Sequence, residues 1–301
     1  MCRFKSGIIL KDRIYIPDHD RHTNMLNELG IEDTRENAER VFVRAELIPP
    51  NNDFFAPISE WTLNVDQDIL PDWFVKEYEE KRMREGMQSW AEAHIHVGKS
   101  NLIITEGMHL LKNSTVTAYD QSVVTAYDQS TVTAYDQSTV TAYDRSVVTA
   151  YDQSMVRAYG QSTVKACGQS IVKAYDQSTV EAYGQSTVKA CDQSTVTACD
   201  QSTVEAYDQS MVTAYGQSTV KACGQSMVKA YDQSMVTAYG QSMVKAYGQS
   251  TVIIHSSSSF VVNRLMLFKD AVALDRRRKQ VYCSKQWSLK KTEGNKNGMR
   301  G

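Results

Sequence analysis

Hydrophobic and polar side chains alternate with an eight-residue period from residue 114 to residue 249. This array holds 17 octads without a gap, with the consensus Ser-Thr-Val-Thr-Ala-Tyr-Asp-Gln. Ser, Val and Ala fill the first, third and fifth positions of every copy, whereas the second and fourth positions vary. An invariant set at period two is typical of one face of a strand. We therefore predict five-residue strands with Ser, Val and Ala facing inward, in a fold of stacked repeats.

The last three positions of the octad predict a turn. Position six is Tyr in 13 octads and Cys in four, and position seven is Asp in ten and Gly in seven. Gly adopts positive φ freely, and Asp tolerates it better than most residues. A helix is disfavoured because eight is a poor multiple of 3.6 and because Val, Thr, Tyr, Asp and Gly are weak helix formers. Disorder is disfavoured by the Val and the Tyr or Cys of each octad, so we predict a β-solenoid.

The size of one coil is open between 16 residues, from two octads, and 24 residues, from three. In a 16-residue coil, Glu181 stacks beside Lys165 on strands about 4.8 Å apart, which is favourable. The cysteines indicate the other size, because Cys167 and Cys191 are 24 residues apart and would be close enough for a disulfide in the larger coil. We predict 16 residues per coil, and a disulfide between these two cysteines would contradict that choice.

The octad resembles the repeat region of bacterial ice-nucleation proteins, in which a 16-residue coil consists of two similar octets. The shared elements are Ser-Thr-x-Thr-Ala, as in residues 114–118, and Tyr-Gly, as in Tyr159-Gly160. The resemblance covers the array, under half of the chain, and implies a solenoid that presents Thr-x-Thr ladders to water and to ice. Elsewhere in the array Lys, Glu, Arg, Met, Val or Ile interrupts the pattern. The octads with both threonines give the candidate ligand surface, Thr115, Thr117, Thr131, Thr133, Thr139, Thr141, Thr195 and Thr197.

Residues 1–97 predict a small α+β head before the array. Apolar alternation and turn residues indicate a hairpin in residues 8–16 and strands at 40–48 and 61–65. Helix start and stop signals indicate helices at 22–29 and from 71 to about 94.

The array is predicted to continue to residue 252 and to be capped at both ends, because open coils expose strand edges and core. Residues 98–113 look like degraded octads, with Leu102, Ile104, Met108 and Leu110 in alternation. Residues 253–291 predict a C-terminal β cap with a hairpin, and residues 292–301 a disordered tail. The complete chain is thus predicted to be mainly β.

Charge is distributed unevenly along the chain. The net charge of −2 combines −7 for residues 1–97, −4 for the array and +8 for residues 250–301. An acidic head and a basic tail can attract each other or a neighbouring molecule. The basic run at residues 276–279 is expected to be a solvated hairpin tip rather than a nucleic-acid site, because aromatic residues do not interleave it.

Three features of the head are candidates for chemistry. Cys2 would become an N-terminal nucleophile after removal of Met1, but an incidental cysteine is the simpler interpretation. His19 and His22, among alternating aspartates, are ligand types for Zn²⁺ or Fe²⁺, although a polar turn with a helix cap is expected at this spacing. His94 and His96 are expected to interact with the C-terminus of the long helix. We expect neither an enzyme nor a cofactor, with an enzyme in the head as one alternative.

Regular rows of Thr, Lys, Tyr and Met on a rigid rod predict a non-enzymatic scaffold or binding protein. Its partner would be a repetitive surface, such as a polymer, a cell envelope, ice or a second copy, and ice binding or nucleation is the other alternative. Candidates for pairing two copies, or for a higher assembly, are the tyrosines at the coil edges, Tyr119, Tyr127, Tyr135, Tyr143 and Tyr151.

Targeting features of the sequence favour the cytoplasm as the default location. Neither an apolar run of about 18 residues nor a secretory signal is found, and six cysteines at irregular spacing do not predict a disulfide framework. A phage particle and non-classical export stay open. The opening residues 1–5 together with the array also resemble uncharacterised proteins of gut bacteria and their phages, which implies no activity.

Overall fold

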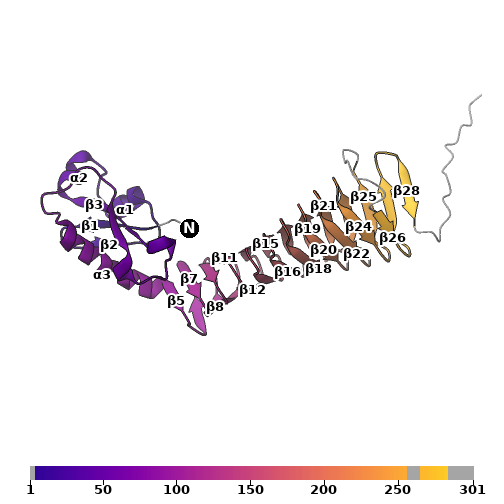
Figure 1. Cartoon of the computed structure of the whole chain (residues 1–301), viewed down its shortest axis with the longest axis horizontal. Helices are drawn as coiled ribbons and strands as arrows, with labels where there is room; N and C mark the ends of the chain where they lie inside the picture. Colours follow the sequence, from indigo (N-terminus) through magenta and orange to yellow (C-terminus); the bar gives the residue numbers. More distant parts are fainter. Residues whose placement is uncertain (1–3, 256–264, 284–301) are drawn as a thin grey trace, which may run out of the picture.

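A computed structural model describes residues 4–255 and 265–283. The chain forms a head of helices and a small sheet, followed by a long β-solenoid that ends in a hairpin (Figure 1). The predicted mainly-β class, with 16-residue coils, is confirmed. Cys2, part of the predicted C-terminal cap and the predicted disordered tail lie outside the described residues.

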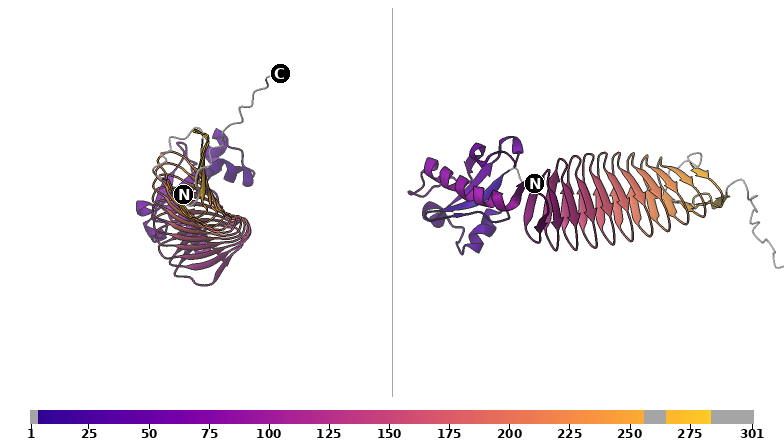
Figure 2. Two further views of the ribbon diagram at one scale, coloured as in Figure 1. Left: turned by 90° about the vertical axis from the view of Figure 1, so that its right-hand side faces the viewer. Right: turned by 90° about the horizontal axis from the view of Figure 1, so that it is seen from below.

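Two parallel sheets form the walls of the solenoid, and the chain passes from one to the other at every octad (Figure 2). The even sheet has 11 strands, β6 (Leu102–Ile104), β8 (Thr115–Ala118), β10 (Thr131–Ala134), β12 (Val147–Ala150), β14 (Thr163–Ala166), β16 (Thr179–Ala182), β18 (Thr195–Ala198), β20 (Met211–Ala214), β22 (Met227–Ala230), β24 (Met243–Ala246) and β26 (Leu265–Leu267).

The odd sheet has 13 strands, and its last strand pairs antiparallel with the one before it. They are β5 (Ile95–Val97), β7 (Met108–Lys112), β9 (Val123–Tyr127), β11 (Thr139–Ala142), β13 (Met155–Ala158), β15 (Ile171–Ala174), β17 (Thr187–Ala190), β19 (Thr203–Ala206), β21 (Thr219–Ala222), β23 (Met235–Ala238), β25 (Thr251–Ile254), β27 (Val272–Asp275) and β28 (Gln280–Cys283). The β27–β28 hairpin surrounds the basic run, as predicted.

The strand register agrees with the charge argument for coil size. Lys165 pairs with Glu181 on adjacent strands of the even sheet, and Glu205 lies between Lys189 and Lys221 on the odd sheet. The Nζ of Lys221 is 3.4 Å from a carboxylate oxygen of Glu205. The cysteine argument for a 24-residue coil is wrong, because Cys167 and Cys191 lie on opposite edges of the solenoid and both are free thiols.

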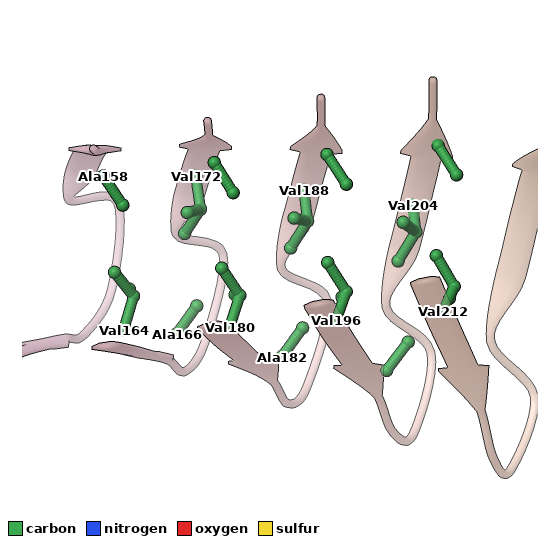
Figure 3. Packing of buried hydrophobic residues seen from close by; sticks show 14 of the residues in the cluster. Ala158, Val164, Ala166, Val172, Val180, Ala182, Val188, Val196, Val204 and Val212 are labelled. Carbon is green, nitrogen blue, oxygen red and sulfur yellow. The ribbon is translucent and has the colours of Figure 1, made fainter. Parts of the chain in front are cut away.

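The core of the array is a thin layer of small side chains between the two sheets. Val and Ala at the third and fifth positions are buried in every octad and point at the opposite sheet (Figure 3). The Ser at the first position is also buried, and in many octads its hydroxyl donates to the carbonyl three residues earlier, as Ser162 does to Tyr159 at 2.7 Å. The invariant positions are therefore those that fit between closely spaced sheets.

Each turn passes through the left-handed region at position seven. All ten aspartates and all seven glycines there have positive φ, for example 55° at Asp176 and 66° at Gly184. The Asp carboxylate also joins coils, because Oδ2 of Asp200 accepts the backbone N–H of Gly184 at 3.0 Å. Asp thus offsets its backbone strain with a hydrogen bond, and Gly avoids the strain.

The first coil differs from the predicted cap in its register. Met108 and Leu110 were expected inward, but His109 and Leu111 align with the inward Val124 and Ala126 of the next odd strand. Leu110 faces outward and is buried in the core of the head. Strand β7 is apolar on both faces because the head covers its outer side, so simple alternation does not give its register.

The head is a four-stranded antiparallel sheet in the order β2 (Ile14–Tyr15), β1 (Lys5–Leu10), β3 (Phe42–Ile48), β4 (Thr62–Val65). Residues of α3 (Lys76–His94), including Met83 and Met87, cluster with one face of this sheet. Residues of α1 (His22–Glu28) cluster with the other face, and α2 (Arg35–Arg40) precedes β3. The short 3-10 helices are η1 (Pro50–Asn52) and η2 (Ile58–Glu60). The strand predicted from residue 40 begins at Phe42 because α2 occupies the preceding residues.

Candidate binding surfaces

The predicted threonine surface is divided between the two sheets. Thr115 and Thr117 of β8 lie directly beside Thr131 and Thr133 of β10, so these four form a continuous block on the even sheet. Thr139 and Thr141 lie on the odd sheet. Thr195 and Thr197 are on the even sheet but separated from the block by β12, β14 and β16, where Val147, Lys165 and Glu181 interrupt the rows. The structure therefore unites four of the eight candidate threonines.

The predicted tyrosine row is likewise two rows, one along each edge of the solenoid. Edge 1 consists of the turns that follow the even strands, and edge 2 of the turns that follow the odd strands. The rings of Tyr119, Tyr135 and Tyr151 stack on edge 1 with centroids 5.1 and 4.9 Å apart. Tyr127 and Tyr143 stack on edge 2 at 5.0 Å. Each row follows from the 16-residue coil, which aligns every second octad.

Cysteines interrupt both rows in the middle of the array. On edge 1, Cys167 and Cys199 lie on either side of Tyr183, which has no tyrosine directly above or below it. The ammonium group of Lys165 lies 5.3 Å from the centroid of the Tyr183 ring, and the Tyr183 hydroxyl donates to Glu181. Edge 2 repeats this arrangement, with Lys189 over Tyr207 at 5.0 Å and the hydroxyl on Glu205.

The array thiols are poorly suited to be nucleophiles. Burial raises the pKa of Cys167, Cys191, Cys199 and Cys223 above the usual range of a thiol. A raised pKa lowers the fraction of reactive thiolate at neutral pH. These cysteines therefore act as short side chains within the aromatic rows.

The two edges differ in what covers them. On edge 2, Phe55 of the head packs edge-to-face on Tyr127 at 5.5 Å, and burial raises the pKa of Tyr127 to about 12. Edge 2 also carries Arg145, the single replacement of the last Gln of the octad. On edge 1, stacked Gln side chains bond to each other along the rod, as Gln217 does to Gln233 at 3.5 Å. Edge 1 is thus the more regular surface.

The head separates the two histidines that were metal candidates. His19 faces Glu28, with Nε2 2.9 Å from a carboxylate oxygen. His22 faces Asp66 across a distance of 3.2 Å from Nδ1 to Oδ2. Glu46 lies close to the second pair, and the ligand atoms of His22, Glu46 and Asp66 all lie within 4.8 Å of one another. Asp66 and Glu46 were not candidates from sequence, because 20 or more residues separate each member of this group from the next.

His94 and His96 belong to a stack of rings at the joint between the head and the array. The ring of His109 lies between them, with centroid distances of 5.3 Å to each, and His94 stacks on Trp90 at 4.8 Å. His94 Nε2 is 2.8 Å from Asp18, and its Nδ1 is 2.8 Å from the Trp90 carbonyl in the last turn of α3. His96 is buried at the open end of the solenoid core, and burial lowers its pKa to about 4.

The longest helix of residues 4–255 and 265–283 is α3, and no helix there is apolar and long enough to span a membrane. Comparisons with protein-family models, curated proteins and solved structures found no match to this chain. The arrangement of side chains on the solenoid is therefore the basis for a functional proposal.

Proposed function

We propose that the protein is a non-enzymatic scaffold whose solenoid binds a repetitive surface, and that this surface is edge 1 of a second copy. The observation that carries the proposal is the order of side chains along edge 1. From the head to the hairpin the row consists of Tyr119, Tyr135, Tyr151, Cys167, Tyr183, Cys199, Tyr215, Tyr231 and Tyr247. The order of residue types is the same in both directions, with Tyr183 at the centre.

A row with this symmetry matches itself in an antiparallel pair. A two-fold axis at Tyr183 would place Tyr119 opposite Tyr247 of the partner, and each cysteine opposite a cysteine. Isologous interfaces of this kind require a surface that is complementary to itself. The row of edge 2 lacks this symmetry, since Tyr127 and His255 occupy its two ends and the two cysteines lie nearer the second end.

Charge favours the same orientation. Residues 1–97 carry −7 and residues 250–301 carry +8, so an antiparallel pair brings each acidic head near a basic tail. A parallel pair would place like charges together, which opposes association. Partly exposed tyrosine rings supply the apolar contact, because Tyr combines a large apolar area with a polar tip that tolerates water.

The test is sedimentation velocity of the full chain over a range of concentrations. We expect a concentration-dependent dimer that weakens as salt is raised, because surface charges are screened. The triple variant Tyr135→Ser, Tyr151→Ser and Tyr231→Ser should be monomeric. A matched triple variant on edge 2, Tyr143→Ser, Tyr159→Ser and Tyr239→Ser, should still dimerise. A wild-type monomer at all concentrations would remove the proposal.

Ice binding is the second candidate, and the continuous block of Thr115, Thr117, Thr131 and Thr133 is the observation that favours it. We expect Thr115→Lys with Thr131→Lys to lower the freezing temperature of supercooled droplets that contain the protein. Thr139→Lys on the odd sheet is the control, because it lies outside the block. Droplets that freeze with buffer alone, together with unchanged ice crystal shape, would remove this candidate.

A further inference from the structure

Three side chains from separate parts of the head converge at one point of its surface. His22 is the first residue of α1, Glu46 lies in β3, and Asp66 follows the end of β4. One nitrogen of His22 and one carboxylate oxygen from each acid lie within 4.8 Å of one another. Two carboxylates at this distance repel each other, so their convergence on an imidazole requires a compensating positive charge.

The imidazole is oriented as a metal ligand would be. Nε2 of His22 is 3.3 Å from the carbonyl oxygen of Ala45, which assigns the ring hydrogen to Nε2. The lone pair of Nδ1 then points toward Asp66, whose Oδ2 is 3.2 Å away. A backbone carbonyl on the second ring nitrogen is the usual partner of a metal-bound histidine. Two ligands at about 2.0–2.1 Å from a tetrahedral ion are themselves about 3.3 Å apart, close to the observed distance.

Both carboxylates are held by the sheet. The backbone N–H of Asp66 donates to the Arg44 carbonyl at 2.9 Å, which fixes the start of the loop after β4. One oxygen of Glu46 accepts the amide of Asn64 at 3.0 Å, so its second oxygen is available for a ligand. Arg44 lines the same open pocket but is paired with Asp33.

We propose that His22, Glu46 and Asp66 bind one divalent transition-metal ion of the zinc type. One nitrogen and two carboxylate oxygens suit Zn²⁺ or Mn²⁺, and three protein ligands leave room for water on the exposed side. A protonated His22 paired with Asp66 is the competing explanation, but that pair leaves the approach of Glu46 without a cause. The proposal is independent of the pairing of the solenoids.

The experiment is a calorimetric titration of the full, metal-free chain with ZnCl₂ at pH 7.5, after alkylation of the cysteines to remove thiol ligands. We expect one equivalent of Zn²⁺ to bind, together with a higher melting temperature of the head followed by tryptophan fluorescence. His22→Ala and Asp66→Asn should each lower the affinity by at least the about 10- to 100-fold that is typical for loss of an outer-shell partner.

His19→Ala is the matched control, since His19 pairs with Glu28 in the same head and should leave affinity unchanged. Glu46→Gln gives a third ligand variant that keeps side-chain volume, and the fluorescence of each variant before titration verifies that its head is folded. Absence of binding to the wild type, unchanged affinity in both His22→Ala and Asp66→Asn, or an equal loss in His19→Ala would each overturn the proposal.

Discussion

The array and the head are stabilised in different ways. Every coil of the array buries the same small Val and Ala side chains, and each strand pairs with strands 16 residues before and after it. The head buries large side chains, including Trp61, Phe42 and Met83, that come from distant parts of the chain. Damage to the array should therefore spread only through neighbouring coils, whereas damage to the head should affect it as a unit.

The largest expected effect comes from a charge in the core of the array. Val188 is fully buried, and Val188→Asp would place an unpaired carboxylate between the sheets. We expect a loss of about 4 kcal/mol or more from the surrounding coils. Proteolysis should cut near the substitution, while fluorescence of the three head tryptophans stays unchanged. Thr187→Asp, one residue away on the exposed face, is the control and should resist cleavage like the wild type.

Acid should weaken the joint between the two regions. The folded pKa of His96 is about 4, below the ordinary value of 6.5, so the unfolded state binds more protons between these values. Stability contributed by neutral His96 is therefore present above about pH 6.5 and is lost as the pH falls toward about 4, up to about 3 kcal/mol. Burial also lowers the pKa of His109, while Asp18 opposes that shift and Lys99 adds to the one at His96.

Thermal unfolding followed from pH 7.5 to 4.5 measures this effect. His96→Gln should flatten the decline in melting temperature, and His19→Gln, which alters an exposed pair, should leave it unchanged. An equal decline in His96→Gln would show that the joint does not sense pH.

The difference between the regions also explains what could be predicted from sequence. In the array, period-two burial and the 16-residue charge pairs give the neighbours of each residue, so the coil, the core and the turns follow. In the head, alternation gave the positions of β1 and β3, but α2 was not predicted. Its arginines and glutamates pair along an exposed surface and none of its residues is buried, so an apolar periodicity is absent.

A turn position gives a smaller effect with a built-in comparison. Gly184 has a φ of 66°, and an added Cβ would lie 3.1 Å from the Gly168 carbonyl oxygen. We expect Gly184→Ala to lower stability by about 1–2 kcal/mol. Gly184→Asp should cost less, because its carboxylate can accept a backbone N–H of the preceding coil, as Asp200 does. Chemical denaturation of both variants measures the difference, and an equal loss would contradict this role of the aspartates.

The smallest effect is expected from the outward charges, where two lysines should respond in opposite directions. Lys189 lies between Lys173 and Glu205, and its ammonium also contacts Tyr207, so Lys189→Glu should destabilise by about 0.2–1 kcal/mol. Lys173 lies between Arg157 and Lys189, and Lys173→Glu should stabilise by a similar amount. Denaturation at low salt tests both, and shifts of the same sign would contradict the paired register.

The candidate surfaces show the same contrast. The tyrosine rows follow from the coil size, although the sequence alone did not divide them into two edges of unequal regularity. The neighbours of His22 could not be predicted, because Glu46 and Asp66 reach it only through the order of strands in the head sheet. The histidine stack was missed for a similar reason, since His109 depends on the shifted register of β7.

Antiparallel pairing through edge 1 is tested most directly by photo-oxidative cross-linking of tyrosines. Tyr119 and Tyr247 lie on β8 and β24 turns, eight coils apart in one chain, so a dityrosine between them must join two chains. After trypsin digestion, we predict a cross-link between the peptide of residues 246–264, whose one tyrosine is Tyr247, and the peptide of residues 113–145. A cross-link that joins two copies of the 246–264 peptide, or an absence of intermolecular dityrosine, would contradict the antiparallel pair.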